Sequence, residues 1–210
     1  MRFNQKILRI VLLTCLPMIS CEVERKPMSS GIPEKIPIRE YRDVPSVSLT
    51  NQEGNPFELA DLKGKIWIAN FIFTSCNAEC VVLSYNMNRL QAEFAEDETI
   101  DFVSFSMDPQ TDNPKRLKQY GMIQNADFEK WNFLTGDAGK IQKLVKESFL
   151  QAAAVTPEER AKLVSNKTKI LHSNSFAIVD ATGKVRAYVD GMGPDVVEQT
   201  KEVIATLRAE

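Results

Sequence analysis

The stretch IWIANFIFTSCNAEC, residues 66–80, decides the fold class of this chain. Its first eight residues are a continuous apolar run of strand-forming types, which is typical of a strand buried on both faces of a sheet. Thr74 and Ser75 end the run, and Cys76 follows at once. Apolar side chains then recur at helical spacing, at Leu83, Met87, Leu90 and Phe94. The stretch therefore predicts a buried strand, a turn that carries the cysteines, and an amphipathic helix.

Strand and helix patterns continue to alternate along the rest of the chain. Further strands are predicted at 47–49, 102–106, 131–134, 176–179 and 185–189. Further helices are predicted from Pro114, with Asp112 or Asn113 as the cap, over 141–149, from 156 and over 194–207. This order predicts an α/β domain whose mixed central sheet is flanked by helices. It is the order of a thioredoxin-like fold with an N-terminal extension and an insert near 150–171.

Length and charge limit the classes of protein to which the chain can belong. The chain has 210 residues and a formal net charge of −2. Its N-terminal leader contains three basic residues, so the net charge without the leader is −5. A nucleic-acid-binding domain needs a basic face, so this balance argues against nucleic acid as a partner. The body that remains after the leader and a linker is the size of one domain.

The first 20 residues predict an export signal. A positive n-region is formed by Arg2, Lys6 and Arg9. It precedes an apolar stretch at 10–19, which is well short of the ~20 residues that span a bilayer. The sequence MISC at 18–21 resembles a bacterial lipobox with Met in place of the usual Leu. We therefore expect Cys21 to carry lipid and to anchor the chain to a membrane of a bacterial envelope, with the domain outside the cytoplasm. An uncleaved anchor and a plain signal peptide are the alternatives.

Residues 21–43 are predicted to link this anchor to the folded domain. Three prolines interrupt the segment, at positions 27, 33 and 37. Proline-rich linkers are extended, at about 3.1 Å per residue, so the segment can hold a domain away from a membrane. The domain itself is predicted to span residues 44–210.

Cys76 and Cys80 are the chemistry-bearing pair. They are predicted to lie at the start of a helix, where free N–H groups and a partial positive charge favour thiolate. A disulfide between residues four apart closes a tiny loop and constrains little of the unfolded chain. The spacing therefore fits a reactive pair or a metal clip better than a structural staple.

His172 is the third candidate, and it is the one histidine in the sequence. It comes just before the strand predicted at 176–179, and in thioredoxin folds the segment that enters this strand approaches the cysteine loop. Thiolate sulfur selects Cu(I) and zinc, and imidazole suits copper in either oxidation state. A set of two cysteines and one histidine is one ligand short of a closed structural zinc site, so it suits copper that is passed on.

Three segments resemble the SCO/SenC/PrrC family. The first is the cysteine loop at 73–80, the second is SMDP at 106–109 with the LKQY that follows Pro114, and the third is His172 with the hairpin after it. The resemblance covers residues 44–207 in order. It implies that Cys76, Cys80 and His172 bind copper, as Cu(I) or Cu(II). It also implies a copper-receiving subunit of cytochrome c oxidase, or another copper protein, as the partner.

The cysteine loop departs from the family pattern at three positions. The family usually has Pro after each cysteine, where this chain has Asn77 and Val81, and often an Asp where Ala78 stands. The loop backbone is therefore less restrained than is usual. Three methionines, Met107, Met122 and Met192, are further thioether candidates, although Met more often fills gaps in a core.

Three other functions stay open on the sequence alone. A membrane-anchored thiol–disulfide oxidoreductase would use Cys76 and Cys80 as its redox pair and would not need His172. A thiol peroxidase would consume peroxide, and a domain that only binds partners would have inert thiols. We expect the copper metallochaperone, which is not an enzyme, rather than these alternatives.

Overall fold

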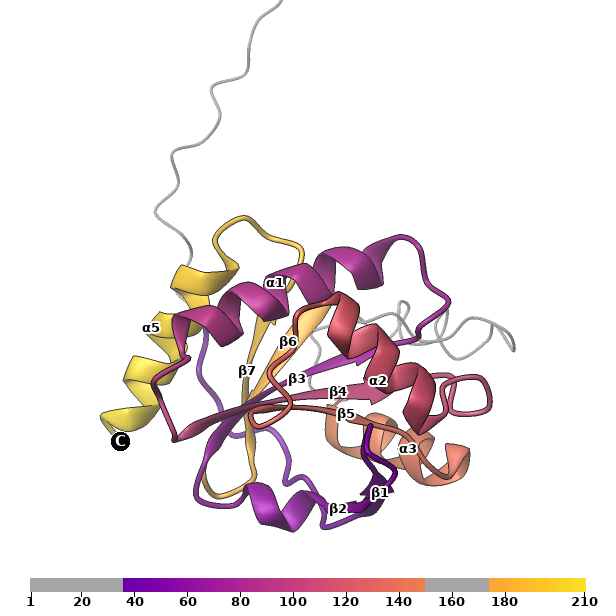
Figure 1. Ribbon diagram of the computed structural model, residues 1–210. Coiled ribbons are helices and arrows are strands. Elements are labelled where there is room, and N and C mark those ends of the chain that lie inside the picture. Colours follow the sequence, from indigo (N-terminus) through magenta and orange to yellow (C-terminus); the bar gives the residue numbers. More distant parts are fainter. Residues whose placement is uncertain (1–35, 150–173) are drawn as a thin grey trace, which may run out of the picture. The chain divides into compact units, whose positions relative to one another are not determined.

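A computed structural model describes residues 36–149 and 174–210 of the chain. Its centre is a five-stranded sheet in the order β5-β4-β3-β6-β7 (Figure 1). The strands are β3 (Ile66–Ile72), β4 (Ile100–Ser106), β5 (Trp131–Leu134), β6 (Ser175–Val179) and β7 (Val185–Asp190). β3, β4 and β5 pair in parallel, whereas β6 is antiparallel to both β3 and β7. The predicted mixed sheet and thioredoxin-like order are confirmed.

The middle of the sheet is formed by the two strands with the most continuous apolar runs. Every residue of β3 and of β4 is buried, because helices or loops cover both faces of these strands. Their register pairs Ile66 with Ile100 and Ile72 with Ser106, so the two strands end together at one edge of the sheet. That edge carries the cysteines, because they follow β3.

Three helices cover one face of the sheet and a second group of elements covers the other (Figure 1). The first face is covered by α1 (Glu79–Glu93), α2 (Pro114–Ile123) and α5 (Val196–Arg208). The second is covered by α3 (Ala138–Leu144), the π-helix η2 (Val145–Phe149), the hairpin of β1 (Ser48–Thr50) and β2 (Pro56–Glu58), and the 3-10 turn η1 (Leu59–Leu62). The core therefore consists of two layers, one on each side of the sheet.

The segment before β1 runs along β7 and hydrogen-bonds to it. The N–H groups of Arg39, Tyr41 and Val44 donate to carbonyls of residues 186, 185 and 183, and the N–H of Val185 donates back to Arg42. These bonds pair an edge that would otherwise present free backbone groups. The C-terminal end of the predicted linker thus lies against the sheet.

Most predicted elements are confirmed, including one of the two caps predicted for α2, and two details differ. β2 was not predicted, because its first residue is Pro56 and the strand has only three residues. The helix predicted over 141–149 is α3 only to Leu144 and widens into the π-helix η2 beyond it. Asn113, not Asp112, caps α2, accepting from the N–H of Arg116 (3.0 Å). The insert near 150–171 and the short helix predicted from 156 lie outside the described residues.

Candidate metal centre

The two cysteines lie where β3 passes into α1. After Ile72 the chain turns, and the N–H of Cys76 donates to the carbonyl of Phe73 (3.1 Å). Helix α1 begins at Glu79, so Cys80 lies in its first turn, as predicted. Both side chains are buried, with 8% of Cys76 and 1% of Cys80 exposed, and both are free thiols.

The sulfur of Cys76 takes the place of a helix cap. The first N–H groups of an α-helix have no partner within the helix, and Ala78 at the N-cap position supplies no side-chain oxygen. The Cys76 sulfur instead accepts hydrogen bonds from the backbone N–H groups of Ala78 and Cys80. This arrangement stabilises negative charge on that sulfur.

The pKa values of the two thiols are shifted in opposite directions. Burial raises the pKa of Cys76, but the hydrogen bonds from the N–H groups of Ala78 and Cys80 and from the Cys80 thiol outweigh it, so its pKa lies below the ordinary value. Burial raises the pKa of Cys80 to about 12, and a hydrogen bond from the backbone of Phe73 offsets only part of this effect. The pair therefore loses its first proton from Cys76, and the Cys80 thiol donates to the resulting thiolate.

The side chain of Tyr120 on α2 hydrogen-bonds to two residues of α1, Ser84 and Cys80. Tyr120 on α2 lies 2.8 Å from the hydroxyl of Ser84, oxygen to oxygen, and donates to the carbonyl of Cys80 (3.3 Å). Burial raises the pKa of Tyr120 to about 12, so its hydroxyl stays a neutral donor. These contacts fix α2 against the part of α1 that carries Cys80.

Asp112 is a component of this edge whose contacts the sequence did not predict. Its carboxylate is fully buried and accepts from the Thr74 hydroxyl (2.5 Å), the Thr74 N–H (3.2 Å) and the Ser106 hydroxyl (2.7 Å). Arg116 in turn donates from Nε to the Thr74 hydroxyl oxygen (2.6 Å). A usable signal was present, because Thr74 and Ser106 each stand at the carboxyl end of a predicted neighbouring strand, where polar residues meet.

Hydrogen bonds through Gly191 connect the start of β6 to α1, the helix that carries Cys80. The carbonyl of Asn174 accepts from the N–H of Gly191 (2.7 Å), and the carbonyl of Gly191 accepts from the amide of Asn86 on α1 (2.7 Å). Gly191 has no room for a side chain, because a Cβ would lie 2.5 Å from Leu83 and 2.8 Å from the Asn174 carbonyl. His172, the third predicted ligand, lies outside the described residues, two positions before Asn174.

The three candidate methionines lie in different surroundings. Met122 is 63% exposed on α2, and Met107 packs against the core layer on the far face of the sheet. Met192 packs against the layer that contains both cysteines. Trp67 and Trp131 are core residues.

Within residues 36–149 and 174–210, no three His, Cys, Asp or Glu side chains gather around one point. The described donor set is therefore the two thiols. Thiolate sulfur is a soft ligand that suits Cu(I), and two such ligands leave coordination positions open for a third. The residues present thus fit copper, and they fit hard cations such as Mg²⁺ poorly, because those prefer oxygen ligands.

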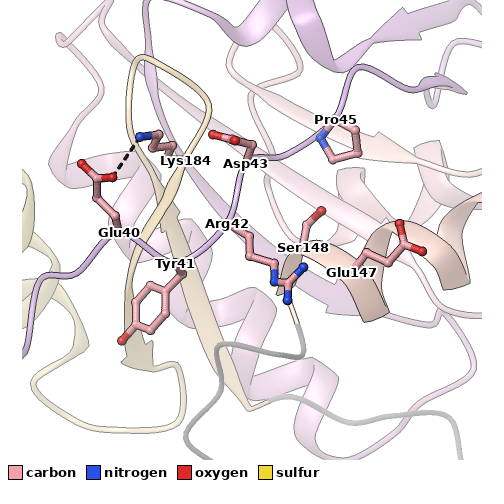
Figure 2. A pocket seen from close by; sticks show the side chains of 8 residues that line it. All are labelled: Glu40, Tyr41, Arg42, Asp43, Pro45, Glu147, Ser148 and Lys184. Atoms are coloured by element: carbon pink, nitrogen blue, oxygen red, sulfur yellow. Dashed lines mark hydrogen bonds and ion pairs between the residues drawn. The ribbon is translucent and has the colours of Figure 1, made fainter.

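A cleft of about 670 Å³ lies elsewhere, beside β7 (Figure 2). Arg42, Asp43 and Pro45 of the N-terminal segment line it, together with Glu147 and Ser148 of the π-helix. An ion pair between Glu40 and Lys184 (2.9 Å) forms another part of its wall. Its lining contains no sulfur ligand. The thiol pair and this cleft are therefore separate regions of the molecule.

A family model described as SCO1/SenC matches residues 40–208. The chain belongs to the SCO1/SenC family. It is 34% identical over 152 residues to the SCO1 protein homolog of Bacillus subtilis (strain 168), a match that covers 71% of this chain and 75% of that protein. No helix in the described part of this SCO1/SenC chain has the length and apolar character needed to cross a membrane.

Solved structures of SCO proteins share the fold. A SCO1/SenC family lipoprotein from Bacillus anthracis str. Ames is 33% identical, with a TM-score of 0.65 over 80% of this chain and 94% of that one. BsSco, described with a disulfide switch as a member of the Sco family of cytochrome c oxidase assembly proteins, is 30% identical, with a TM-score of 0.64 over 84% and 97%. ScoI of Bradyrhizobium japonicum, solved with copper bound, is 19% identical and shares the fold, with a TM-score of 0.59 over 80% and 99%.

Proposed function

We propose that this SCO1/SenC protein binds one copper ion through Cys76, Cys80 and His172 and passes it to a copper-receiving protein, in the first place the copper-bearing subunit of cytochrome c oxidase. The observation that carries the proposal is the pair of free, hydrogen-bonded thiols at the N-terminus of α1. Membership of the family and the description of BsSco as a cytochrome c oxidase assembly protein support the choice of partner.

The surroundings of the two sulfurs suit copper that must enter and leave. Cys76 presents its sulfur at the surface end of the pair, because it is the more exposed of the two. N–H groups already stabilise its thiolate, so little reorganisation is needed when the metal arrives. Cys80 is fixed from below by the Tyr120 contact to its carbonyl. We expect a thiolate of the receiving protein to replace His172 first and the two cysteines afterwards, with no change in the oxidation state of copper.

The predicted role of His172 has indirect support from the described residues. Asn174 is held to Gly191, and Gly191 is held to α1, so the chain that follows His172 starts β6 beside the cysteine-bearing helix. An imidazole would complete a set of two sulfurs and one nitrogen. Such a set leaves a position open, as transfer to another protein requires.

A thiol–disulfide reductase is the second candidate, and the opposite acidities of the two thiols favour it. In this reaction the Cys76 thiolate attacks a target disulfide, forms a mixed disulfide and releases one target thiolate. Cys80 then loses its proton and attacks the Cys76 sulfur, which releases the second target thiol. The target gains two electrons, the Cys76–Cys80 pair loses them, and a separate dithiol reductant is needed to restore the pair.

We also propose that Cys21 carries lipid and holds the domain outside the cytoplasm of a bacterium, with residues 1–20 as the export signal and 21–43 as the linker. The lipobox-like sequence at 18–21 is the observation behind this proposal, and the similar protein from Bacillus anthracis is described as a lipoprotein. A Cys21→Ser variant that stays in the membrane fraction with an unchanged mass would contradict it.

Copper titration of the reduced protein tests the proposed function. We expect one equivalent of copper to bind with sulfur-to-copper charge-transfer absorption, and we expect none of this absorption in Cys76→Ser or Cys80→Ser. Met122→Leu is the matched control, because it removes the exposed thioether sulfur of a residue on α2. Unchanged copper binding in the two Cys variants, together with disulfide reduction by the parent, would put the reductase in first place.

A further inference from the structure

We infer that Asp112 is a positioning residue for the cysteine loop: its buried carboxylate holds Thr74, and through Thr74 it fixes where Cys76 stands relative to Cys80. This inference rests on the proposed function, since it assigns Asp112 a part in the same metal and redox site. None of the described hydrogen bonds of Asp112 is to either sulfur, so we assign its effect on the site to the backbone of the loop.

Every described hydrogen bond of the carboxylate is to a residue at the end of β3 or β4. Both of its oxygens receive donors: Oδ1 accepts from the Thr74 hydroxyl (2.5 Å) and the Thr74 N–H (3.3 Å), and Oδ2 accepts from the Ser106 hydroxyl (2.7 Å) and the Thr74 N–H (3.2 Å). None of the described hydrogen bonds of its side chain is to α2, although α2 begins two residues later at Pro114. Asp112 therefore fixes the strand ends rather than its own helix.

The hydroxyl group of Thr74 is fixed in one orientation by two hydrogen bonds. Arg116 donates to the hydroxyl oxygen of Thr74 (2.6 Å), so the hydroxyl proton is directed to Asp112. Thr74 thus connects a guanidinium to a buried carboxylate by hydrogen bonds. Charge-assisted hydrogen bonds are stronger than neutral ones, so residue 74 is a rigid point in the loop.

Thr74 is close to Cys76 along the chain. Only Ser75 separates Thr74 from Cys76, and the N–H of Cys76 returns to the carbonyl of Phe73 (3.1 Å). The turn is therefore held on both sides of Thr74, at Phe73 and at Cys76. The loop has no proline after either cysteine, so this hydrogen-bonded anchor supplies a restraint that the sequence of the loop does not.

Asp112 is itself held in place by the turn that follows β4. Its N–H donates to the carbonyl of Asp108 (2.8 Å), and the N–H of Asp108 donates to the Ser106 hydroxyl (3.1 Å). The N–H of Met107 donates to the carbonyl of Ile72 (2.7 Å), which ties the exit of β4 to the exit of β3. The turn after β4 therefore forms a support on which the cysteine loop rests.

Asp112→Asn tests the inference with almost no change in volume. An amide nitrogen would meet the donors of Thr74 or Ser106, so the loop loses part of its support. We expect copper to dissociate about 10- to 100-fold more readily from the variant, the range typical for residues that orient metal ligands. Thr74→Val should have the same effect, and Thr74→Ser, which keeps the hydroxyl, should restore the behaviour of the parent.

A readout without copper keeps this test separate from the proposed function. The equilibrium between the dithiol and oxidised glutathione reports how well the two sulfurs are placed: two thiols of the protein lose two electrons and two protons, and one glutathione disulfide becomes two thiols. We expect the equilibrium constant for forming the Cys76–Cys80 disulfide to fall in Asp112→Asn and Thr74→Val and to stay at the parent value in Thr74→Ser.

Asp101→Asn is the matched control. Asp101 is a second buried aspartate, but it lies on β4 and pairs with Lys65 (2.9 Å) near the start of that strand, at the end opposite the cysteine loop. We expect it to lower the melting temperature and to leave both site readouts unchanged. Equal changes in Asp112→Asn and Asp101→Asn, or parent values in Asp112→Asn and Thr74→Val, would overturn the inference. If the parent binds no copper but the glutathione equilibrium shifts as expected, the proposed function fails and the role of Asp112 stands.

Discussion

The two faces of the sheet show how one strand serves two purposes. Alternate residues of β3 point to opposite faces, and on one of them Ile68 and Ile72 contribute to the layer that includes Cys76 and Cys80. On the other, Trp67 and Phe71 contribute to an aromatic layer whose members include Phe105 and Phe149. The first face ends in a hydrogen-bonded polar edge, and the second contains stacked and edge-to-face aromatic rings. The proposed copper site and most of the aromatic ring contacts therefore lie on different sides of the same strand, and we expect that each can be changed without the other.

The largest expected effect separates function from stability. Cys76→Ser removes the thiolate that the helix N-terminus stabilises, so we expect complete loss of copper binding with little change in the urea midpoint of unfolding. Copper titration and urea denaturation of the same preparation measure both quantities. If Cys76→Ser still binds one equivalent of copper, the proposed copper site on the face that carries the cysteines is wrong.

Phe149→Ala should do the reverse. Phe149 is buried and packs edge-on against Trp67 and Phe71, with ring centroids 6.2 Å and 5.1 Å away. Deleting a buried aromatic ring costs about 3–5 kcal/mol of unfolding free energy, and at temperatures where the variant is folded we expect it still to bind one copper ion. Tyr85→Ala is the control, because that ring is 63% exposed on α1 and its removal should cost little. A loss of copper stoichiometry in folded Phe149→Ala would show that the two faces are coupled.

The two cysteines should differ in reactivity as pH rises. Because hydrogen bonds lower the pKa of Cys76 and burial raises that of Cys80 to about 12, an alkylating reagent should modify Cys76 first across pH 6–9. Thiolate is the reactive form, so the rate at Cys76 should level off below the ordinary thiol pKa of 9.0, while Cys80 stays almost unmodified. Mass spectrometry of peptides after timed iodoacetamide treatment gives both rates. Equal rates at the two positions would contradict the asymmetry.

The smallest expected effect concerns the ion pair of Asp97 with Arg208 at the surface. Hydrogen bonds from Thr99 and then from Arg208 lower the pKa of Asp97 to about 2. A lowered pKa in the folded state means that the stabilisation is present above the unfolded pKa of about 4 and is lost as pH falls through about 2. Asp97→Asn should therefore lower stability at pH 6 by less than about 1 kcal/mol, since the pair is exposed to solvent.

Thermal unfolding at several pH values checks this expectation, with the exposed Glu96→Gln as the control. We expect the difference between parent and Asp97→Asn to disappear toward pH 2. A difference that persists at pH 2 would show that Asp97 acts through packing rather than through its charge.

Local patterns in the sequence predicted the frame of the site but not its long-range contacts. The apolar run at 66–72 and the cysteines after it predicted β3 and the start of α1, because burial on both faces and helical spacing are local signals. Asp112 looked like a helix cap, since its neighbours in sequence are Asn113 and Pro114. Its partner Thr74 lies 38 residues earlier, and only the parallel pairing of β3 with β4 brings the two together.

The π-helix escaped prediction for a related reason. Residues 141–149 have apolar side chains at spacings that fit an ordinary helix, and the widened turn at Val145–Phe149 follows from packing. There Phe149 joins three rings that come from β3 and β4, and its carbonyl accepts from the hydroxyl of Tyr188 on β7 (2.8 Å). Those partners are far away in sequence, so spacing within the segment carries no sign of them.

X-ray absorption at the copper edge, measured on the reduced protein loaded with one equivalent of copper, tests the central claim most directly. The account predicts two sulfur neighbours and one imidazole nitrogen, with the nitrogen lost in His172→Ala and the two sulfurs retained. A copper environment without sulfur, or one that is identical in the parent and in His172→Ala, would contradict the site formed by Cys76, Cys80 and His172.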